Sequence, residues 1–269
     1  MIVFRVVKRF PLLTFFGLNY LFLLLGWHYA KQQIPFTPFL AALIVVPIVS
    51  GRAGLIEWAS RIIRWRVGVQ WYAAAILTPL IATGAAAYLN ILMGASFVPI
   101  RLSQLSPLIS QAVMLFLYVG LGEEPGWRGF AIPQLQKRFS AITTTLIIAV
   151  MGIGWHLPIF LMGNRPWANI LPIITGYFVF TWLFNNSRGS VLIAMLLHTA
   201  HNTFVSGIFG AMFYGANRTQ YSWLMGLTYG VIVIVILLTS RNRYLITRTH
   251  NERPQVEIPT EQRALGRQL

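Results

Sequence analysis

The sequence contains no cysteine and no aspartate among its 269 residues. The absence of cysteine excludes disulfides and thiol chemistry, and the absence of aspartate excludes a catalytic pair of aspartates. Acids of any kind are rare, because the chain has only six and all of them are glutamates. Three lie in a polar C-terminal stretch, which leaves three in the apolar part of the chain: Glu57, Glu123 and Glu124.

Charged residues are scarce overall, and their number indicates whether water or lipid surrounds the protein. Only 10% of the residues are charged and 56% are hydrophobic, whereas soluble domains carry roughly 25% charged residues. The formal net charge of +15 does not indicate nucleic acid, because the basic residues lie in short segments between apolar runs and not on one folded face. We therefore expect a lipid bilayer, and no nucleic acid, as the surrounding partner.

Runs of about twenty apolar residues predict membrane-spanning helices. They occur at 10–30, 36–50, 70–95, 105–126, 141–162, 167–186, 190–213 and 221–239. We therefore expect an all-α, polytopic membrane bundle of about eight transmembrane helices. The first run has the length of a spanning helix and no small-residue cleavage site follows it, which favours a membrane helix over a cleaved signal peptide.

A basic segment near 51–67 separates the second and third runs. Arginines alternate there with leucine, isoleucine and tryptophan, a pattern typical of an amphipathic helix lying in the membrane interface. Glu57 and Arg61 are four residues apart and are expected to pair on such a helix. An ordinary charged loop is the alternative.

The distribution of basic residues predicts the orientation of the chain. If the N-terminus is cytoplasmic, 17 of the 21 lysines and arginines fall in cytoplasmic segments, as the positive-inside rule requires. We expect a multi-pass protein of the plasma membrane with both termini in the cytoplasm. The bundle would occupy residues 1–240, and the polar, basic tail at 241–269 is expected to be disordered. The four exceptions to the bias are Lys31, Arg101, Arg165 and Arg218.

Two adjacent glutamates stand out in the fourth apolar run, within GLGEEPGWRGF. A charged side chain at a helix centre costs about 2.5–3.5 kcal/mol on membrane-insertion scales. Glu124 and Arg128 are four residues apart and can pair on one helix face, so Glu123 points elsewhere. Pro125 removes a backbone donor and loosens the helix, which is tolerated at this depth only inside protein or beside water. Alternatively, the two acids mark a helix end near the headgroups.

Histidines in two further apolar runs favour a functional site over a helix end near the headgroups. His156 follows Gly-Trp in the fifth run, and His198, His201 and Asn202 lie in HTAHN in the seventh. A lone buried histidine is most often structural, but polar residues on three separate apolar helices are harder to explain by stability, since interhelical polar bonds average about 0.6 kcal/mol. No HExxH zinc motif and no serine loop with a histidine partner is present. What remains is a carboxylate that activates water, with histidine and asparagine as polarising groups.

These segments resemble the motifs of the CPBP family, the CAAX-protease and bacteriocin-processing intramembrane proteases. EEPGWRG is similar to its EExxxR motif, GWH to its second motif and HTAHN to its HxxxN motif. The likeness is most specific over about 105–205, and it departs from the family in having Gly152 where the second motif usually has phenylalanine.

The resemblance implies a role for each matching residue. Glu123 would activate the attacking water with help from His156, and Glu124 would support the site through Arg128. His198 and Asn202 would stabilise the oxyanion, whereas His201 has no fixed role in the motif. The implied cofactor is either none or one zinc ion, because Glu123, His156 and His198 form an acceptable zinc-ligand set.

The resulting hypothesis is an intramembrane endopeptidase that cuts a membrane-anchored protein or peptide near its end. The site is expected to open toward the cytoplasm, near the end of the fourth helix. Because His156 would otherwise lie too deep, residues 129–145 are expected to run partly along the interface. Two other functions remain open: a non-catalytic membrane scaffold or bacteriocin immunity factor, and a small proton-coupled transporter.

Overall fold

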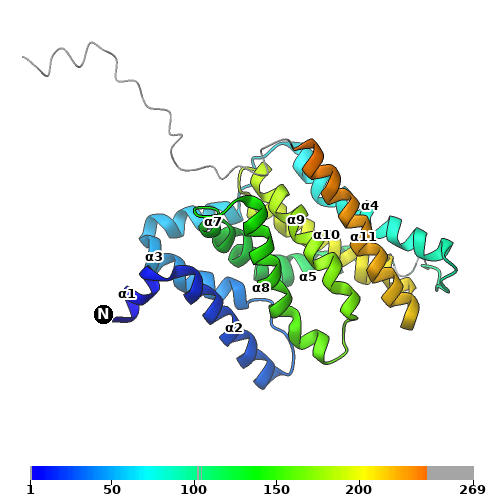
Figure 1. Cartoon of the computed structure of the whole chain (residues 1–269), viewed down its shortest axis with the longest axis horizontal. Helices are drawn as coiled ribbons and strands as arrows, with labels where there is room; N and C mark the ends of the chain where they lie inside the picture. The colour runs from blue at the N-terminus through cyan, green and yellow to red at the C-terminus, as the bar shows by residue number, and fades with distance from the viewer. Residues whose placement is uncertain (1, 102, 104, 241–269) are drawn as a thin grey trace, which may run out of the picture.

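The computed structural model describes residues 2–240 except 102 and 104, and this part of the chain is helical and contains no strand (Figure 1). Seven helical segments are long and apolar enough to cross a membrane. The all-α polytopic bundle is therefore confirmed, and the predicted tail lies outside the described residues. The long helices are α2 (Pro11–Ala30), α3 (Thr37–Ile62), α4 (Val69–Leu92), α8 (Ala141–Leu161), α9 (Ile170–Asn186), α10 (Val191–Thr203) and α11 (Gly215–Thr239), and a short α1 (Ile2–Arg9) precedes them.

The remaining predicted span is a broken helix that does not end where the sequence suggested. Its five consecutive elements are α5 (Leu108–Leu115), the π-helix η2 (Phe116–Gly120), α6 (Leu121–Gly126), the π-helix η3 (Trp127–Ala131) and α7 (Ile132–Leu135). Pro125 loosens the hydrogen-bond ladder, as expected, but π turns on both sides take up the disturbance and the helix continues. The predicted end at 126 is wrong, and the two acids lie inside the helix.

The predicted interfacial segment is a helix and not a loop. Helical hydrogen bonding continues through α3, but Gly51 has φ 63° and ψ −162°, so the chain kinks there. Glycine permits this backbone conformation because it has no Cβ. The second half of α3 runs to Ile62, a few residues short of the predicted end, and the expected pair forms with Arg61 Nε 3.0 Å from Glu57 Oε1.

The broken helix packs closely, through small residues, on the start of α3 and on the connection that precedes it. A Cβ atom on Gly122 would meet the backbone of Pro35, and one on Gly126 would meet the backbone of Pro38. Small residues allow such approach between membrane helices. Trp58 Nε1 also donates a hydrogen bond of 2.9 Å to the carbonyl of Pro125. The segment that carries the two glutamates is thus fixed against the kinked helix.

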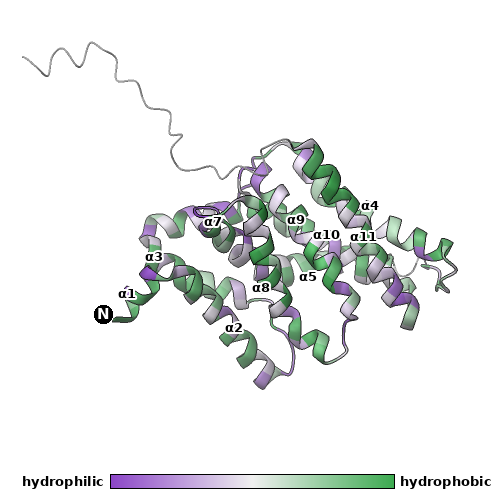
Figure 2. Ribbon diagram, in the orientation of Figure 1, coloured by the Kyte–Doolittle hydropathy of each residue, from purple (hydrophilic) through white to green (hydrophobic). Residues whose placement is uncertain are grey.

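Large apolar side chains cover the outside of the bundle as well as its interior. Leu24, Val150 and Leu238 are 61%, 67% and 75% exposed, and green, hydrophobic residues dominate the outer faces of the long helices in Figure 2. Water would make such a surface unfavourable, whereas lipid solvates it. The exposed apolar surface therefore agrees with a multi-pass membrane protein.

The connections between helices gather at two ends of the bundle. We call the end with the connections 63–68, 136–140 and 187–190 the basic end, because Arg64, Arg66, Lys137, Arg138 and Arg188 lie there. The opposite end holds the connections 31–36, 93–101, 162–169 and 209–214, and we call it the far end. In Figure 1, α8 runs from the basic end, drawn uppermost, to the far end.

Candidate active site

Glu124 is the centre of a buried polar network. Its carboxylate lies within 3.2 Å of Arg128 Nη1 through both oxygens, and His198 Nδ1 is 2.7 Å from Oε1. The Glu124 side chain is fully buried and that of Arg128 is 3% exposed. The predicted pairing of Glu124 with Arg128 is confirmed, and the same carboxylate also orients His198 from a different helix.

Aromatic rings hold the other side of this network. The Arg128 guanidinium carbon lies 4.6 Å from the ring centroid of Tyr177 and 4.1 Å from that of Phe180, both on α9. Phe180 also meets the His198 ring edge to face, with centroids 5.5 Å apart. Cation–π contacts strengthen when desolvated, so the arginine is held by charge on one side and by rings on the other.

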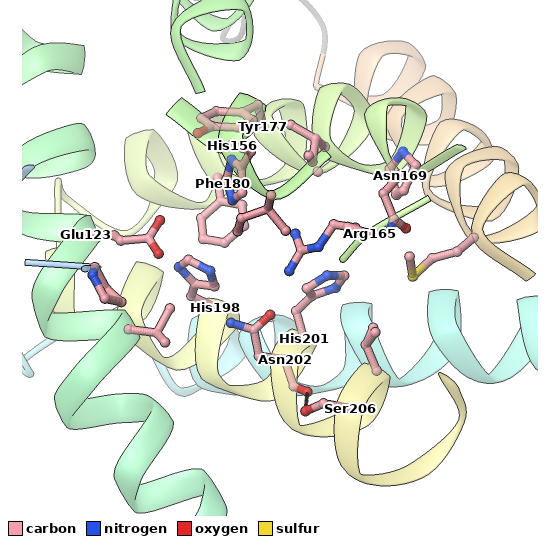
Figure 3. A pocket seen from close by; sticks show the side chains of 18 of the residues that line it. Glu123, His156, Arg165, Asn169, Tyr177, Phe180, His198, His201, Asn202 and Ser206 are labelled. Carbon is pink, nitrogen blue, oxygen red and sulfur yellow. Dashed lines mark hydrogen bonds between the residues drawn. The ribbon is translucent and has the colours of Figure 1, made fainter. Parts of the chain in front are cut away.

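Glu123 points away from this network into a cavity of about 550 Å³ (Figure 3). It makes no hydrogen bond or ion pair with any other residue that the structure describes. The cavity walls include His156 from α8 together with His198 and Asn202 from α10. Glu124 is therefore bonded to other side chains, whereas Glu123 faces the cavity.

His156 has a defined tautomer. Its Nδ1 lies 2.8 Å from the carbonyl oxygen of Gly152, one helical turn earlier. Because a carbonyl only accepts, Nδ1 carries the proton and Nε2 is left with a lone pair. Nε2 can therefore accept a hydrogen bond from water in the cavity.

His201 has a different role from its neighbours. It lines the cavity, but its Nδ1 lies 2.9 Å from the hydroxyl of Tyr229 on α11. This bond joins α10 to α11 at the wall of the cavity. The sequence motif assigns His201 no role, and its contacts are those of a residue that holds the wall in place.

Gly152 is the position where phenylalanine was expected. The structure gives a reason for the departure, because a Cβ atom on Gly152 would collide with the hydroxyl end of Tyr177. Tyr177 is nearly buried and also stacks on Arg128. An aromatic ring from α9 thus occupies the space beside His156.

Replacing Gly152 with alanine is therefore expected to destabilise the protein by about 1–3 kcal/mol, the usual cost of overpacking. Gly17→Ala on α2 is the matched control, since nothing lies within 4 Å of a Cβ there. The penalty of Gly152→Ala should shrink when it is measured in a Tyr177→Ala background, because contacting residues are not additive. Equal unfolding free energies for Gly152→Ala and Gly17→Ala in detergent would contradict this account.

All six residues singled out by the sequence come together in this region. Five line the cavity, and the sixth, Glu124, lies directly behind them: Glu123, Glu124, Arg128, His156, His198 and Asn202. The predicted detour of residues 129–145 along the interface is wrong, because α7 ends at Leu135 and α8 already begins at Ala141. The depths match because Glu123 is about 18 Å from the end of α7, and His156 about 22 Å from the start of α8.

The cavity extends toward the far end and not toward the basic end. Its wall includes Asn164 and Ser206, which are exposed at the far end. None of the residues that line it belongs to the connections of the basic end. The expectation that the site opens on the same side as the basic connections is wrong. It assumed that the acids mark a helix end, whereas the helix continues beyond them.

Sequence reasoning missed Arg165. This residue follows α8 in the 162–169 connection, and Figure 3 shows its side chain reaching into the cavity. In the sequence it stands out only as one of the four basic residues outside the expected cytoplasmic segments. That exception to the charge bias is the one available signal.

The three candidate zinc ligands do not form a metal site as they are arranged. In residues 2–240, apart from 102 and 104, no group of three histidine, cysteine or acidic side chains is placed to hold a metal ion. Nδ1 of His156 and Nδ1 of His198 are both engaged by protein oxygens. These bonds leave Nε2 of each histidine open, so it is the placement of the three side chains, and not their hydrogen bonds, that does not fit a zinc ion.

Comparisons with known proteins point to one family. Residues 105–204 match the family described as type II CAAX prenyl endopeptidase Rce1-like. A CAAX prenyl protease 2 from Methanococcus maripaludis is 26% identical over 98 residues. That match covers 32% of this chain and 36% of the archaeal protein, so it spans about a third of either one. The matched segment runs from α5 to the end of α10 and contains every residue of the predicted site.

Proposed function

We propose that this membrane protein, whose residues 105–204 match the Rce1-like CAAX prenyl endopeptidase family, hydrolyses peptide bonds with water activated by Glu123. The observation that carries the proposal is the division of labour between the two acids. Glu124 is tied to Arg128 and His198, whereas Glu123 faces the cavity without a protein partner. A carboxylate in that position is free to hold and deprotonate water.

The chemistry follows from the positions of the donors and acceptors. Glu123 takes a proton from water, and the oxygen attacks the carbonyl carbon of the substrate. His156 Nε2 helps to orient the water, because its other nitrogen is fixed by Gly152. The C–N bond then breaks, and the amine leaves with the proton that Glu123 held. The products are a carboxylate and an amine.

The negative charge of the intermediate needs donors on the opposite side of the cavity. His198 and Asn202 are one turn apart on α10 and both line the cavity. In its imidazolium form His198 donates one N–H to Glu124 and directs the other toward the cavity. Asn202 supplies a neutral amide donor. Preorganised donors of this kind are worth about 10²–10³ in kcat each.

The two rival functions have less support. A scaffold or immunity factor has no need of a carboxylate left unpaired in a cavity, which is costly at membrane depth. A transporter needs access to its site from both sides, whereas no residue from the connections of the basic end lines the cavity. Membrane-anchored proteins or peptides are the substrates that can enter a cavity inside a membrane-embedded bundle.

The proposal is tested by comparing peptide termini in membranes that contain the wild-type protein or the Glu123→Gln variant. New termini that depend on Glu123 are expected in wild-type membranes only. In this proposal Glu123 activates water without a metal ion, so purified protein should keep its activity after exhaustive chelation. Identical termini in the two membranes would remove the basis for a protease.

We further propose that the basic end faces the cytoplasm of a cell with this protein in its plasma membrane. Most of the lysines and arginines within residues 2–240 lie toward that end, as the positive-inside rule requires. The cavity, which extends toward the far end, would then be reached from the outer half of the membrane. Substrates would be segments that lie in or beyond that half.

Single cysteines can test this orientation, because the chain has none of its own. Asn164→Cys lies at the far end and Lys137→Cys at the basic end, and both positions are exposed. A membrane-impermeant maleimide added to intact cells is expected to label the first and to label the second only after permeabilisation. The reverse pattern would place the cavity on the cytoplasmic side.

A further inference from the structure

Two arginines that the proposed reaction does not use line the same cavity as Glu123. Arg165 comes from the connection between α8 and α9, and Arg218 from the first turns of α11. Neither guanidinium makes a hydrogen bond or an ion pair with a carboxylate in the described part of the chain. Arg218 only stacks on Tyr221, at 5.7 Å from the ring centroid.

Both side chains are half-buried at the cavity wall. A guanidinium has five N–H donors and no acceptor, so each can donate hydrogen bonds to an acceptor in the cavity. Burial lowers the pKa of Arg165, Glu123 opposes that effect, and the charge of Arg218 lowers the pKa further. Arg165 and Arg218 thus carry like charges on the wall of one cavity. By contrast, Arg128 has both a carboxylate partner and two aromatic rings.

An anion between the two arginines would relieve the repulsion and satisfy their donors. The planar fork of arginine matches a carboxylate through two parallel hydrogen bonds. In Figure 3, Arg165 reaches into the cavity from the side opposite Glu123, with His198 and His201 below the space between them. A ligand that spans this space would meet the proposed nucleophilic water at one point and a cation at another.

We propose that Arg165 and Arg218 form a subsite for the free C-terminal carboxylate of the substrate. This inference rests on the proposed function, since it assumes that a peptide occupies the cavity. A cavity of about 550 Å³ holds a ligand of drug size, which corresponds to a short peptide. The subsite would place a bond near the chain end at Glu123, and the released fragment would be short. Glu123 itself would repel a carboxylate, which helps to fix the direction of the bound chain.

Direct binding tests the subsite without hydrolysis. The Glu123→Gln protein is placed in nanodiscs of phosphatidylcholine and titrated with a lipid-anchored fluorescent peptide that ends in either a carboxylate or a carboxamide. The carboxylate peptide is expected to bind at least tenfold more tightly. Adding Arg165→Gln should weaken its binding by about tenfold to a hundredfold, the range for hydrogen bonds to a charged group, and leave the carboxamide unchanged. Arg218→Gln is expected to act in the same direction.

Lys31→Gln is the matched control, since Lys31 is a cation of the far end that does not line the cavity. It should leave both affinities unchanged, and thermal unfolding should show that each variant folds. Equal affinities for the two peptides, or equal losses on Arg165→Gln, would overturn the subsite. A second set of nanodiscs contains phosphatidylglycerol as well. The subsite would also be overturned if Arg165→Gln altered only the binding of that lipid there, because the anion would then be a lipid phosphate. If carboxylate binding behaves as expected but wild-type protein cuts no peptide, the proposed function fails and the subsite stands.

Discussion

Replacing Glu123 with glutamine is expected to lower kcat by about 10²–10⁴-fold, the usual contribution of a general base. Glutamine keeps the size of the side chain but cannot take a proton from water. The free energy of unfolding should not fall, because Glu123 has no protein partner to lose and a charge is removed from the cavity. The measurements are single-turnover cleavage in detergent or nanodiscs and the unfolding of the same samples.

Glu57→Gln is the control for this result. It also removes one carboxylate, but from an exposed pair with Arg61 on the second half of α3. Its kcat should equal that of the wild type. A Glu123→Gln variant with wild-type kcat would show that another group activates the water. A variant that lost both stability and activity would show that Glu123 is a structural acid.

Replacing Glu124 with alanine, unlike Glu123→Gln, should greatly lower the free energy of unfolding. It leaves Arg128 buried without its counter-charge, and breaking a buried ion pair from one side costs about 3–5 kcal/mol. Cleavage should also be lost, because His198 loses the oxygen that orients it. Arg128→Ala is expected to behave similarly. Reversible unfolding in mixed detergent micelles measures the first effect and cleavage the second.

A double variant separates the two roles of this pair. Glu124→Met combined with Arg128→Leu removes both charges and keeps most of the volume, and apolar replacement of a buried pair is often neutral or stabilising. Stability is therefore expected to return while cleavage does not. An unfolding free energy of Glu124→Ala within about 0.5 kcal/mol of the wild type, which is the range of an ordinary surface substitution, would contradict the importance of the network.

The sequence predicted the bundle well because long apolar runs have few alternatives in a membrane. It also predicted the pairing of Glu124 with Arg128, because residues four apart share a helix face. The end of the fourth helix was wrongly placed at 126, where the apolar run stops, because π turns that carry a helix past a proline leave no comparable mark in a sequence. The depth of the site and the direction of its cavity were wrong for that same reason.

Other parts of the site depend on tertiary contacts that no local pattern reveals. Arg165 is separated from the glutamates by a whole helix and a connection, and only the return of α8 brings it to the cavity. The link between Gly152 and Tyr177 likewise joins two helices. The bond from His198 to Glu124 was not predicted either, although both residues were singled out. Spacing along one helix shows which residues share a face of that helix. It does not show which faces of different helices pack against each other.

The π turns that flank α6 set a rotational phase for the whole segment. A π turn spans one more residue than an α turn, and one residue corresponds to about 100° around the helix axis. Deleting one residue from η2 would therefore rotate both carboxylates about the helix axis. Glu124 would no longer point at His198, and Glu123 would no longer point into the cavity. Between Leu108 and Leu135 the chain can exchange side chains at many positions, but its count of residues is constrained much more tightly than its composition.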